Sequence, residues 1–339
     1  MPAVSRMPLI DALKAVAALL IMLNHFASYG PLAVQGRQLL PTLFDGLYDY
    51  GRMAVQVFLV IAGFLAARTL SPHAAPLLRS PWPLIGKRYR RLMVPYGAAL
   101  LLATGSAALS RYGSDDPDVP AAPSFEQVLA HLLLLQGILG FESLSAGIWY
   151  IAIDFQLFAL FALLMALPLP RWVAPGLVLG LAAASLLWLN RNPGLDNWAV
   201  YFFGAYGLGI VAWWGTGPAK QCYWFYLVLA VAVAALLLEF RWRLCLALMV
   251  AVLLAGACNR GWLWTWPDIA TLNWLGQISF ALFLVHYPVL LLVNTAYASL
   301  GVDSVMLAGF CLAMGVVLSI AAADLFHRTV ESRGIDKSG

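Results

Sequence analysis

The chain has 339 residues, of which 62% are hydrophobic and only 11% are charged. Soluble domains carry about 25% charged residues, and one soluble core could not bury this much apolar surface. The composition therefore excludes a soluble enzyme and indicates an integral membrane protein. The formal net charge of +4 becomes informative only through the positions of the charges.

Apolar runs long enough to cross a bilayer, which takes about 20 residues, recur along the whole chain. The first run is too long for the apolar part of a cleaved signal peptide, so we interpret it as a retained helix. The run 125–141 is shorter and amphipathic, which predicts a surface-lying or re-entrant segment. The ten predicted spans are 8–29, 52–70, 93–110, 147–167, 172–189, 198–215, 223–238, 242–258, 274–294 and 304–326.

The positions of the basic residues predict the orientation. Most of the 20 Lys and Arg fall in segments that are cytoplasmic if the N-terminus is cytoplasmic, as the positive-inside rule requires. The predicted fold is therefore an all-α integral membrane protein with about ten transmembrane helices and both termini cytoplasmic. We expect one transmembrane domain over 1–333 and a short cytoplasmic tail over 334–339.

The first predicted helix carries Asp11, Lys14 and His25. The spacing from Lys14 to His25 turns a helix about 20° beyond three full turns and advances it by about 16 Å. Asp11 shares this face, so an acid–base pair lies near the cytoplasmic side and an imidazole near the outer side. Ionisable groups inside a span are functional candidates, although a polar stripe that only joins helices is the alternative.

Two more polar residues fall at a similar depth in other spans. Asp154 lies in the fourth span and His286 in the ninth, and helix rise puts both in the outer half with His25. A carboxylate beside an imidazole fixes its tautomer and stabilises the imidazolium. We therefore predict that these three residues form a general-base site.

A basic run precedes the third span on the cytoplasmic side. On a helix, Lys87, Arg88 and Arg91 lie on one face, where they could bind the phosphates of a soluble cofactor. The alternative is an anchor bound to lipid headgroups.

Six segments of the sequence have the character of motifs: LIDALKAVAALLIMLNH (9–25), VQVFLVIAGFLAA (55–67), KRYRRLMVPY (87–96), WYIAIDFQLF (149–158), LGQISFALFLVHYPV (275–289) and RTVESR (328–333). Together they resemble the acyltransferase-3 family of membrane O-acyltransferases. The resemblance covers nearly the whole chain in family order and departs from the family pattern at Lys14 for Arg, Ala62 for Ser and Phe155 for Glu.

The resemblance implies transfer of an acyl group, usually acetyl, from cytoplasmic acyl-CoA to a hydroxyl of a cell-envelope glycan. It implies that His25 is catalytic and that Lys14 and the 87–91 cluster face CoA. The predicted catalytic residues are His25, Asp154 and His286, and the predicted cofactor-binding residues are Lys14, Asp11, Lys87, Arg88 and Arg91. The expected partners are acyl-CoA, an envelope carbohydrate and the bilayer of a bacterial inner membrane, with no metal and no nucleic acid.

Several alternatives stay open at this stage. His25 could deprotonate the attacking hydroxyl, or carry the acyl group as an acyl-histidine intermediate. A transporter or flippase would show paired broken helices in two halves, and we find no such pair. A ligand sensor that has lost its chemistry is a third hypothesis. The acceptor, the acyl chain and the oligomeric state are not predicted.

Overall fold

The computed structural model describes residues 6–113, 116–216 and 222–332, without the Cys222 side chain. Within these ranges the regular structure is helical and contains no strand, which confirms the all-α prediction. Seven helical stretches in this part of the chain are long and apolar enough to cross a membrane, so the chain is a multi-pass membrane protein. The predicted tail over 334–339 lies outside the described residues.

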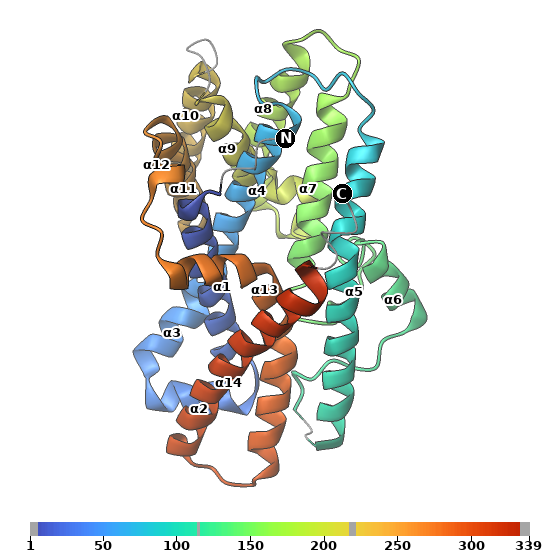
Figure 1. Cartoon of the computed structure of the whole chain (residues 1–339), viewed down its shortest axis with the longest axis vertical. Coiled ribbons are helices and arrows are strands. Elements are labelled where there is room, and N and C mark those ends of the chain that lie inside the picture. Colours follow the sequence, from blue (N-terminus) through green and yellow to red (C-terminus); the bar gives the residue numbers. More distant parts are fainter. Residues whose placement is uncertain (1–5, 114–115, 217–221, 333–339) are drawn as a thin grey trace. The chain divides into compact units, whose positions relative to one another are not determined.

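The predicted spans coincide with apolar helices. Seven reach spanning length: Pro8–Phe26, Pro41–Leu70, Trp82–Gly113, Val173–Arg191, Trp242–Asn259, Ala270–Ser299 and Val305–Glu331. Three are shorter: Trp149–Met165, Ala199–Trp214 and Tyr223–Leu238. The count of ten stays a prediction. In chain order (Figure 1) the helices are α1 (Pro8–Phe26), α2 (Gly30–Leu39), α3 (Pro41–Tyr50), η1 (Gly51–Ala54), α4 (Val55–Leu70), α5 (Trp82–Gly113), α6 (Phe125–Leu132), α7 (Trp149–Met165), α8 (Val173–Leu187), η2 (Leu189–Arg191), η3 (Pro193–Leu195), α9 (Ala199–Trp214), α10 (Cys222–Leu238), α11 (Trp242–Asn259), α12 (Trp262–Thr265), α13 (Ala270–Ser299), α14 (Val305–Phe326) and η4 (His327–Glu331).

The chain divides into two compact units, each built from separate stretches of sequence. The first unit contains the described residues up to Leu13, Val55–Tyr89 and the described part of Ala152–Asn273. The second contains Lys14–Ala54, the described part of Arg90–Ile151, and the described residues from Trp274 onward. A single domain over 1–333 stays a prediction.

Close contact between α4 and α9 organises the first unit. A Cβ atom on Gly63 would lie 2.0 Å from the carbonyl oxygen of Tyr206, and one on Gly209 would lie 2.0 Å from that of Val60. Glycine is therefore required at both positions for the backbones to approach, as is common between transmembrane helices. The segment 55–67, which resembles a family motif, is thus a packing element.

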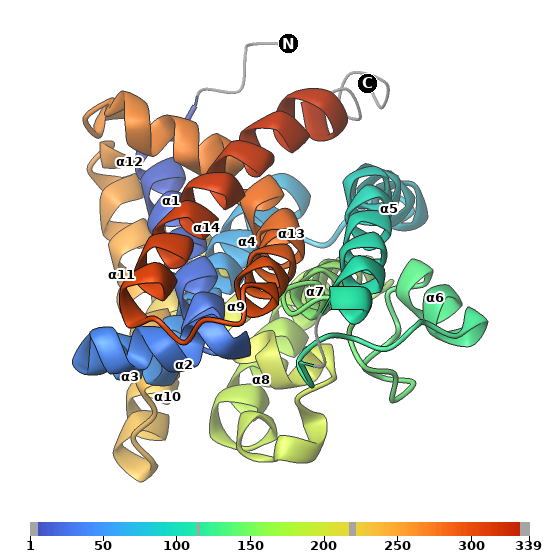
Figure 2. The same cartoon turned by 90° about the horizontal axis from the view of Figure 1, so that it is seen from below.

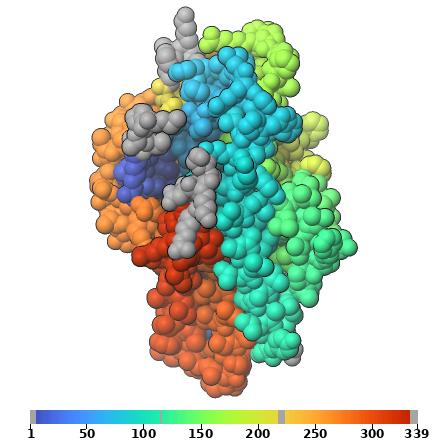
Figure 3. Space-filling view, turned by 45° about the vertical axis from the view of Figure 1, so that its right-hand side comes forward, coloured from blue at the N-terminus to red at the C-terminus, as the bar shows by residue number. Residues whose placement is uncertain are grey.

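In the second unit, α2, α13 and α14 pack around a small apolar core. Leu32, Tyr297 and Ala308 are at most 4% exposed and form its centre. Helix α14 runs across α2 in two perpendicular views (Figure 1, Figure 2), and the surfaces of α13 and α14 (orange and red) adjoin in Figure 3. This packing fixes the part of α13 that follows His286.

Helix α6 has the amphipathic character predicted for the run 125–141. Ser124 caps its start by accepting a hydrogen bond from the backbone of Gln127, and Phe125 is 78% exposed. His131 is buried on the opposite face, where its Nδ1 bonds the carbonyl of Gln127 and its Nε2 accepts from the backbone of Leu144. The helix itself is only eight residues long, which is too short to cross a bilayer.

Candidate active site

The second unit brings together two of the predicted site residues, His25 and His286. His25 lies in the last turn of α1 and His286 near the middle of α13. Nδ1 of His25 is 2.6 Å from Nε2 of His286, and the two residues are 5% and 0% exposed. Two imidazoles from distant parts of the sequence therefore share one buried hydrogen bond.

The hydrogen-bond chain defines the tautomers of the neutral pair. Nδ1 of His286 lies 2.7 Å from the carbonyl oxygen of Leu282, which can only accept, so this nitrogen carries a proton. Nε2 of a neutral His286 is then an acceptor, and Nδ1 of His25 must donate to it. It follows that Nε2 of His25 has no proton and is free to accept one, as in a general base oriented by a hydrogen bond on its other nitrogen.

Asn24 holds the end of α1 that carries His25. Its Nδ2 donates to the backbone carbonyls of Leu47 and Tyr48, at 2.8 and 3.2 Å. Gly51 is the residue after the end of α3, and a Cβ atom there would lie 2.7 Å from the Cβ of Asn24. These contacts join α1 to the end of α3 and restrain the direction of the imidazole.

Two tyrosine rings adjoin the histidine pair. The rings of Tyr29 and Tyr287 meet edge to face at 5.3 Å between centroids, and lie 5.6 and 6.5 Å from the ring of His25. Asp118 connects both segments, because its carboxylate accepts from the backbone of Gly30 and its carbonyl accepts from the Tyr287 hydroxyl. The two tyrosine rings thus line one side of the histidine pair, and hydrogen bonds hold them to the segment around Asp118.

Asn294 fixes the turn that carries Tyr29. Its Oδ1 accepts from the backbone of Leu32 and its Nδ2 donates to the carbonyl of Tyr29. Gly30 has φ +78°, and a Cβ atom there would lie 2.4 Å from Asn294, so only glycine fits. Tyr29, Tyr287 and Asn294 are not among the site residues predicted from the sequence. A polar Asn294 at the end of the run 274–294 was the available signal.

Asp154 forms an ion pair in the first unit. Its Oδ2 lies 2.6 Å from Nη2 of Arg88, and the side chains are 10% and 32% exposed. The Arg88 guanidinium also lies 4.6 Å from the centre of the Phe158 ring, one helical turn after Asp154. From the sequence, an imidazole is expected beside this carboxylate, whereas the partner in the structure is a guanidinium. Its approach to His25 and His286 stays a prediction.

The other predicted cofactor-binding residues differ in exposure. Lys87 and Arg91 are exposed on α5, while Arg88 is turned toward Asp154. Asp11 pairs with Arg6 at 3.1 Å. Lys14 is half-buried, and its predicted pairing with Asp11 stays a prediction.

In the described ranges, no group of three or more His, Cys, Asp and Glu side chains is arranged to hold a metal ion. Each imidazole of the buried pair can itself accept or donate a proton. A bare Nε2 can remove a proton from a hydroxyl or attack a carbonyl carbon.

Comparison with known proteins defines the class of protein. The model of the acyltransferase-3 family, described as an acyltransferase domain, matches residues 8–324. The chain therefore belongs to this family.

Among curated proteins, the chain is similar to "Regulator of hypoxia-inducible factor 1" of Caenorhabditis elegans, with 28% identity over 170 residues. The aligned part is 45% of this chain and 33% of that protein, so the chain matches about a third of the relative's length. No solved structure shows a significant match.

Proposed function

We propose that the protein transfers an acyl group, most often acetyl, from cytoplasmic acyl-CoA to a hydroxyl of a cell-envelope carbohydrate. Family membership supports the reaction class. The observation that carries the proposal is the chain from the Leu282 carbonyl through His286 to His25, which leaves Nε2 of His25 as a base. Membership in an acyltransferase family favours this chemistry over a transporter or flippase.

In the proposed reaction, Nε2 of His25 takes the proton of the acceptor hydroxyl as its oxygen attacks the thioester carbonyl. The hydrogen bond from Nδ1 to His286 keeps the ring oriented and helps spread the positive charge of the imidazolium. When the tetrahedral intermediate collapses, the C–S bond breaks and the CoA sulfur leaves. The imidazolium returns its proton to that sulfur, which restores the neutral pair. The acyl-His25 route uses the same nitrogen as nucleophile.

We assign the donor side to the basic residues of α1 and α5. Lys87 and Arg91 are exposed and can bind the phosphates of CoA. Arg88 is held by Asp154, so we give Asp154 a positioning role toward the donor. Lys14 stands on the His25 face of α1, with Asp11 three residues earlier, and supplies a positive charge along the path to the histidines.

On the acceptor side, we assign Tyr29 and Tyr287 to binding of the sugar. Their rings adjoin His25 and can present flat apolar faces to the C–H face of a sugar ring. This assignment puts the acceptor hydroxyl near the base.

The proposed topology follows the positions of the charges. We assign ten transmembrane helices in a single domain over 1–333, with both termini cytoplasmic, in a bacterial inner membrane. In this orientation the basic start of α5 is on the cytoplasmic side, where CoA is soluble. The end of α1 that carries His25 is toward the outer side, where the envelope glycan lies.

The test is acyl transfer by the purified protein, measured as CoA release and as ester formation on envelope glycans by mass spectrometry. Wild-type protein should release CoA and esterify the glycan, and His25→Ala should lower both by several orders of magnitude, to a small residual rate. The matched control is His73→Ala, which removes an exposed histidine and should retain activity. Wild-type turnover by purified, folded His25→Ala protein would contradict the proposal.

A further inference from the structure

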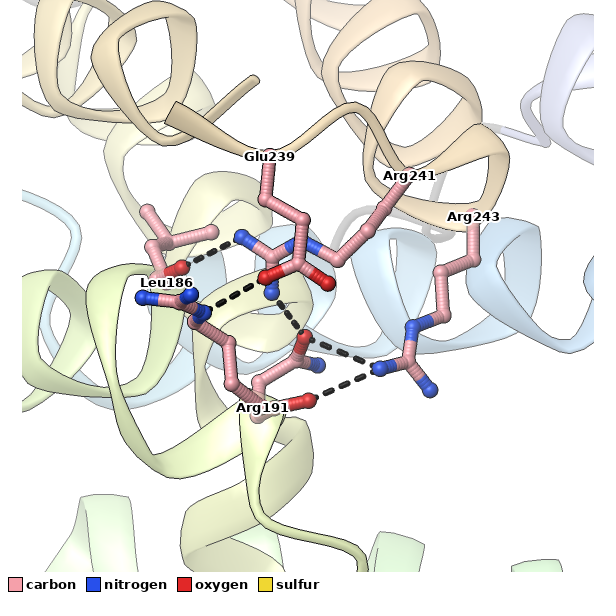
Figure 4. A network of polar contacts seen from close by, with 6 residues as sticks. Leu186, Arg191, Glu239, Arg241 and Arg243 are labelled. Carbon is pink, nitrogen blue, oxygen red and sulfur yellow. Dashed lines mark hydrogen bonds and ion pairs between the residues drawn. The ribbon is translucent and has the colours of Figure 1, made fainter. Parts of the chain in front are cut away.

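A cluster of three arginines lies in the first unit, where η2 meets the turn between α10 and α11 (Figure 4). The arginine cluster consists of Arg191, Arg241 and Arg243, together with Glu239. Because this turn joins two apolar helices, it belongs at the membrane–water interface. The proposed acyl-transfer chemistry does not use any of these residues.

Among the described residues of the cluster, the one carboxylate of Glu239 faces three guanidinium groups. Glu239 is bonded to Arg191 at 2.5 Å. Arg241 donates to Oδ1 of Asn190 and to the carbonyl of Leu186, which are uncharged. Arg243 donates to the Tyr201 hydroxyl and to Asn190, which are also uncharged. A guanidinium stays protonated in proteins, so the cluster has more positive than negative charge.

Arg241 is the most buried member and still has a donor to offer. The residue is 9% exposed, and its Nε has no hydrogen-bond acceptor among the residues the structure describes. Burial lowers the pKa of this guanidinium, the Glu239 carboxylate opposes that shift, and Arg243 and Arg191 lower the pKa further. A buried donor and an excess of positive charge are both stabilised by an anion.

The start of α11 adds backbone donors at the same place. Arg241 is the N-cap residue of this 18-residue helix, and its side chain makes no capping hydrogen bond. The first N–H groups of a helix have no intrahelical acceptor and favour phosphate oxygens. The backbone and the guanidinium groups therefore favour the same kind of ligand.

The surroundings indicate a lipid as the source of the anion. Phe240 and Trp242 alternate with the charged residues of the turn, are 58% and 57% exposed, and meet edge to face at 4.8 Å. Leu237, in the last turn of α10, is 84% exposed. Aromatic rings at this depth are typical of the headgroup region, where arginines bind phosphate esters in a bidentate manner.

We propose that the arginine cluster binds the phosphate group of a membrane lipid at the turn between α10 and α11. The oxyanion accepts hydrogen bonds from the guanidinium groups, and the acyl chains lie along the exposed apolar side of α10. The role is binding, with no covalent step.

The test measures lipid binding by the purified full chain in a non-ionic detergent, using native mass spectrometry and thermal unfolding. The probes are dioctanoyl phosphatidylglycerol, dioctanoyl glycerol without phosphate, and inorganic phosphate. Wild-type protein should bind phosphatidylglycerol at least about tenfold more tightly than either of the others. Two results with the wild-type protein would overturn the proposal. One is that dioctanoyl glycerol binds as tightly as phosphatidylglycerol, and the other is that inorganic phosphate does.

Variants then assign the binding to the cluster. Arg243→Gln, in a half-buried position, should weaken phosphatidylglycerol binding about tenfold, and Arg243→Lys should restore part of it. Arg37→Gln is the matched control, because Arg37 is paired with Asp45 on the exposed surface of the second unit. Unchanged binding in Arg243→Gln, or an equal loss in Arg37→Gln, would contradict the assignment. Because the readout is binding, either result is independent of acyl transfer.

Discussion

The histidine pair of the second unit and the Arg88–Asp154 ion pair of the first unit satisfy buried polar groups in different ways. His25 and His286 are two neutral rings joined by one hydrogen bond, which leaves a free lone pair on Nε2 of His25. Arg88 and Asp154 neutralise each other and hold each other in place. The first arrangement suits proton transfer, and the second suits positioning.

The largest effect is expected from His286→Leu. This change removes the acceptor of the His25 Nδ1 proton and the contact that selects the tautomer, so kcat should fall by about 10²–10⁴-fold. His286→Gln, whose amide oxygen can still accept, should recover part of the rate. Steady-state kinetics with His73→Leu as an exposed control measures this, and a wild-type kcat in His286→Leu would show that His286 has no role in orienting the base.

Asp154→Asn should have a smaller and different effect. Loss of the carboxylate leaves Arg88 without its counter-charge, so the apparent KM for acyl-CoA should rise about tenfold with a smaller change in kcat. The control is Asp45→Asn, which breaks the exposed ion pair between Arg37 and Asp45. Loss of an exposed ion pair should have little effect on either constant. A collapse of kcat at unchanged KM would instead give Asp154 a role beside the imidazole, as the sequence analysis predicted.

Lys14 tests whether the donor path needs positive charge or the geometry of an arginine fork. Lys14→Arg should keep substantial activity and Lys14→Met should lose most of it, because a point charge fills the role. Rates are normalised to folded protein. A lysine that only anchors α1 by reaching the headgroups would affect expression in both variants and leave the rates near normal.

Tyr287→Phe should produce the smallest change. It keeps the ring beside His25 but removes the hydrogen bond to the Asp118 carbonyl, which contributes about 1 kcal/mol. The apparent KM for the acceptor should rise a few-fold, and kcat should stay within a factor of about three. If Tyr287→Phe abolished turnover, the hydroxyl would belong to the reacting groups.

Much of the fold could be predicted from the sequence. Apolar runs locate helices well because a bilayer requires continuous apolar segments, and each predicted span coincides with an apolar helix. The long helix α5 shows the limit of this reasoning, since it begins at Trp82 and includes the basic run before the predicted span. Charged residues continue a helix beyond the apolar region, so hydropathy cannot mark its start.

The candidate site could be predicted only in part. His25 and His286 stand out because ionisable groups are rare in spans. Their direct contact, and the pairing of Asp154 with Arg88, depend on how helices pack, and equal depth in a membrane does not determine which helices touch. Tyr29 and Gly30 gave no signal, because their roles come from a turn held by Asn294.

The central claim is that His25 and His286 act as one unit, and a double-mutant cycle on acyl transfer tests it most directly. The variants are His25→Ala, His286→Leu and the double variant, with kcat measured at saturating acyl-CoA on protein of matched thermal stability. Residues that act as a unit are non-additive, so the double variant should lose no more activity than His25→Ala alone. If the two single losses multiply in the double variant, the residues act independently and the pair is not the base.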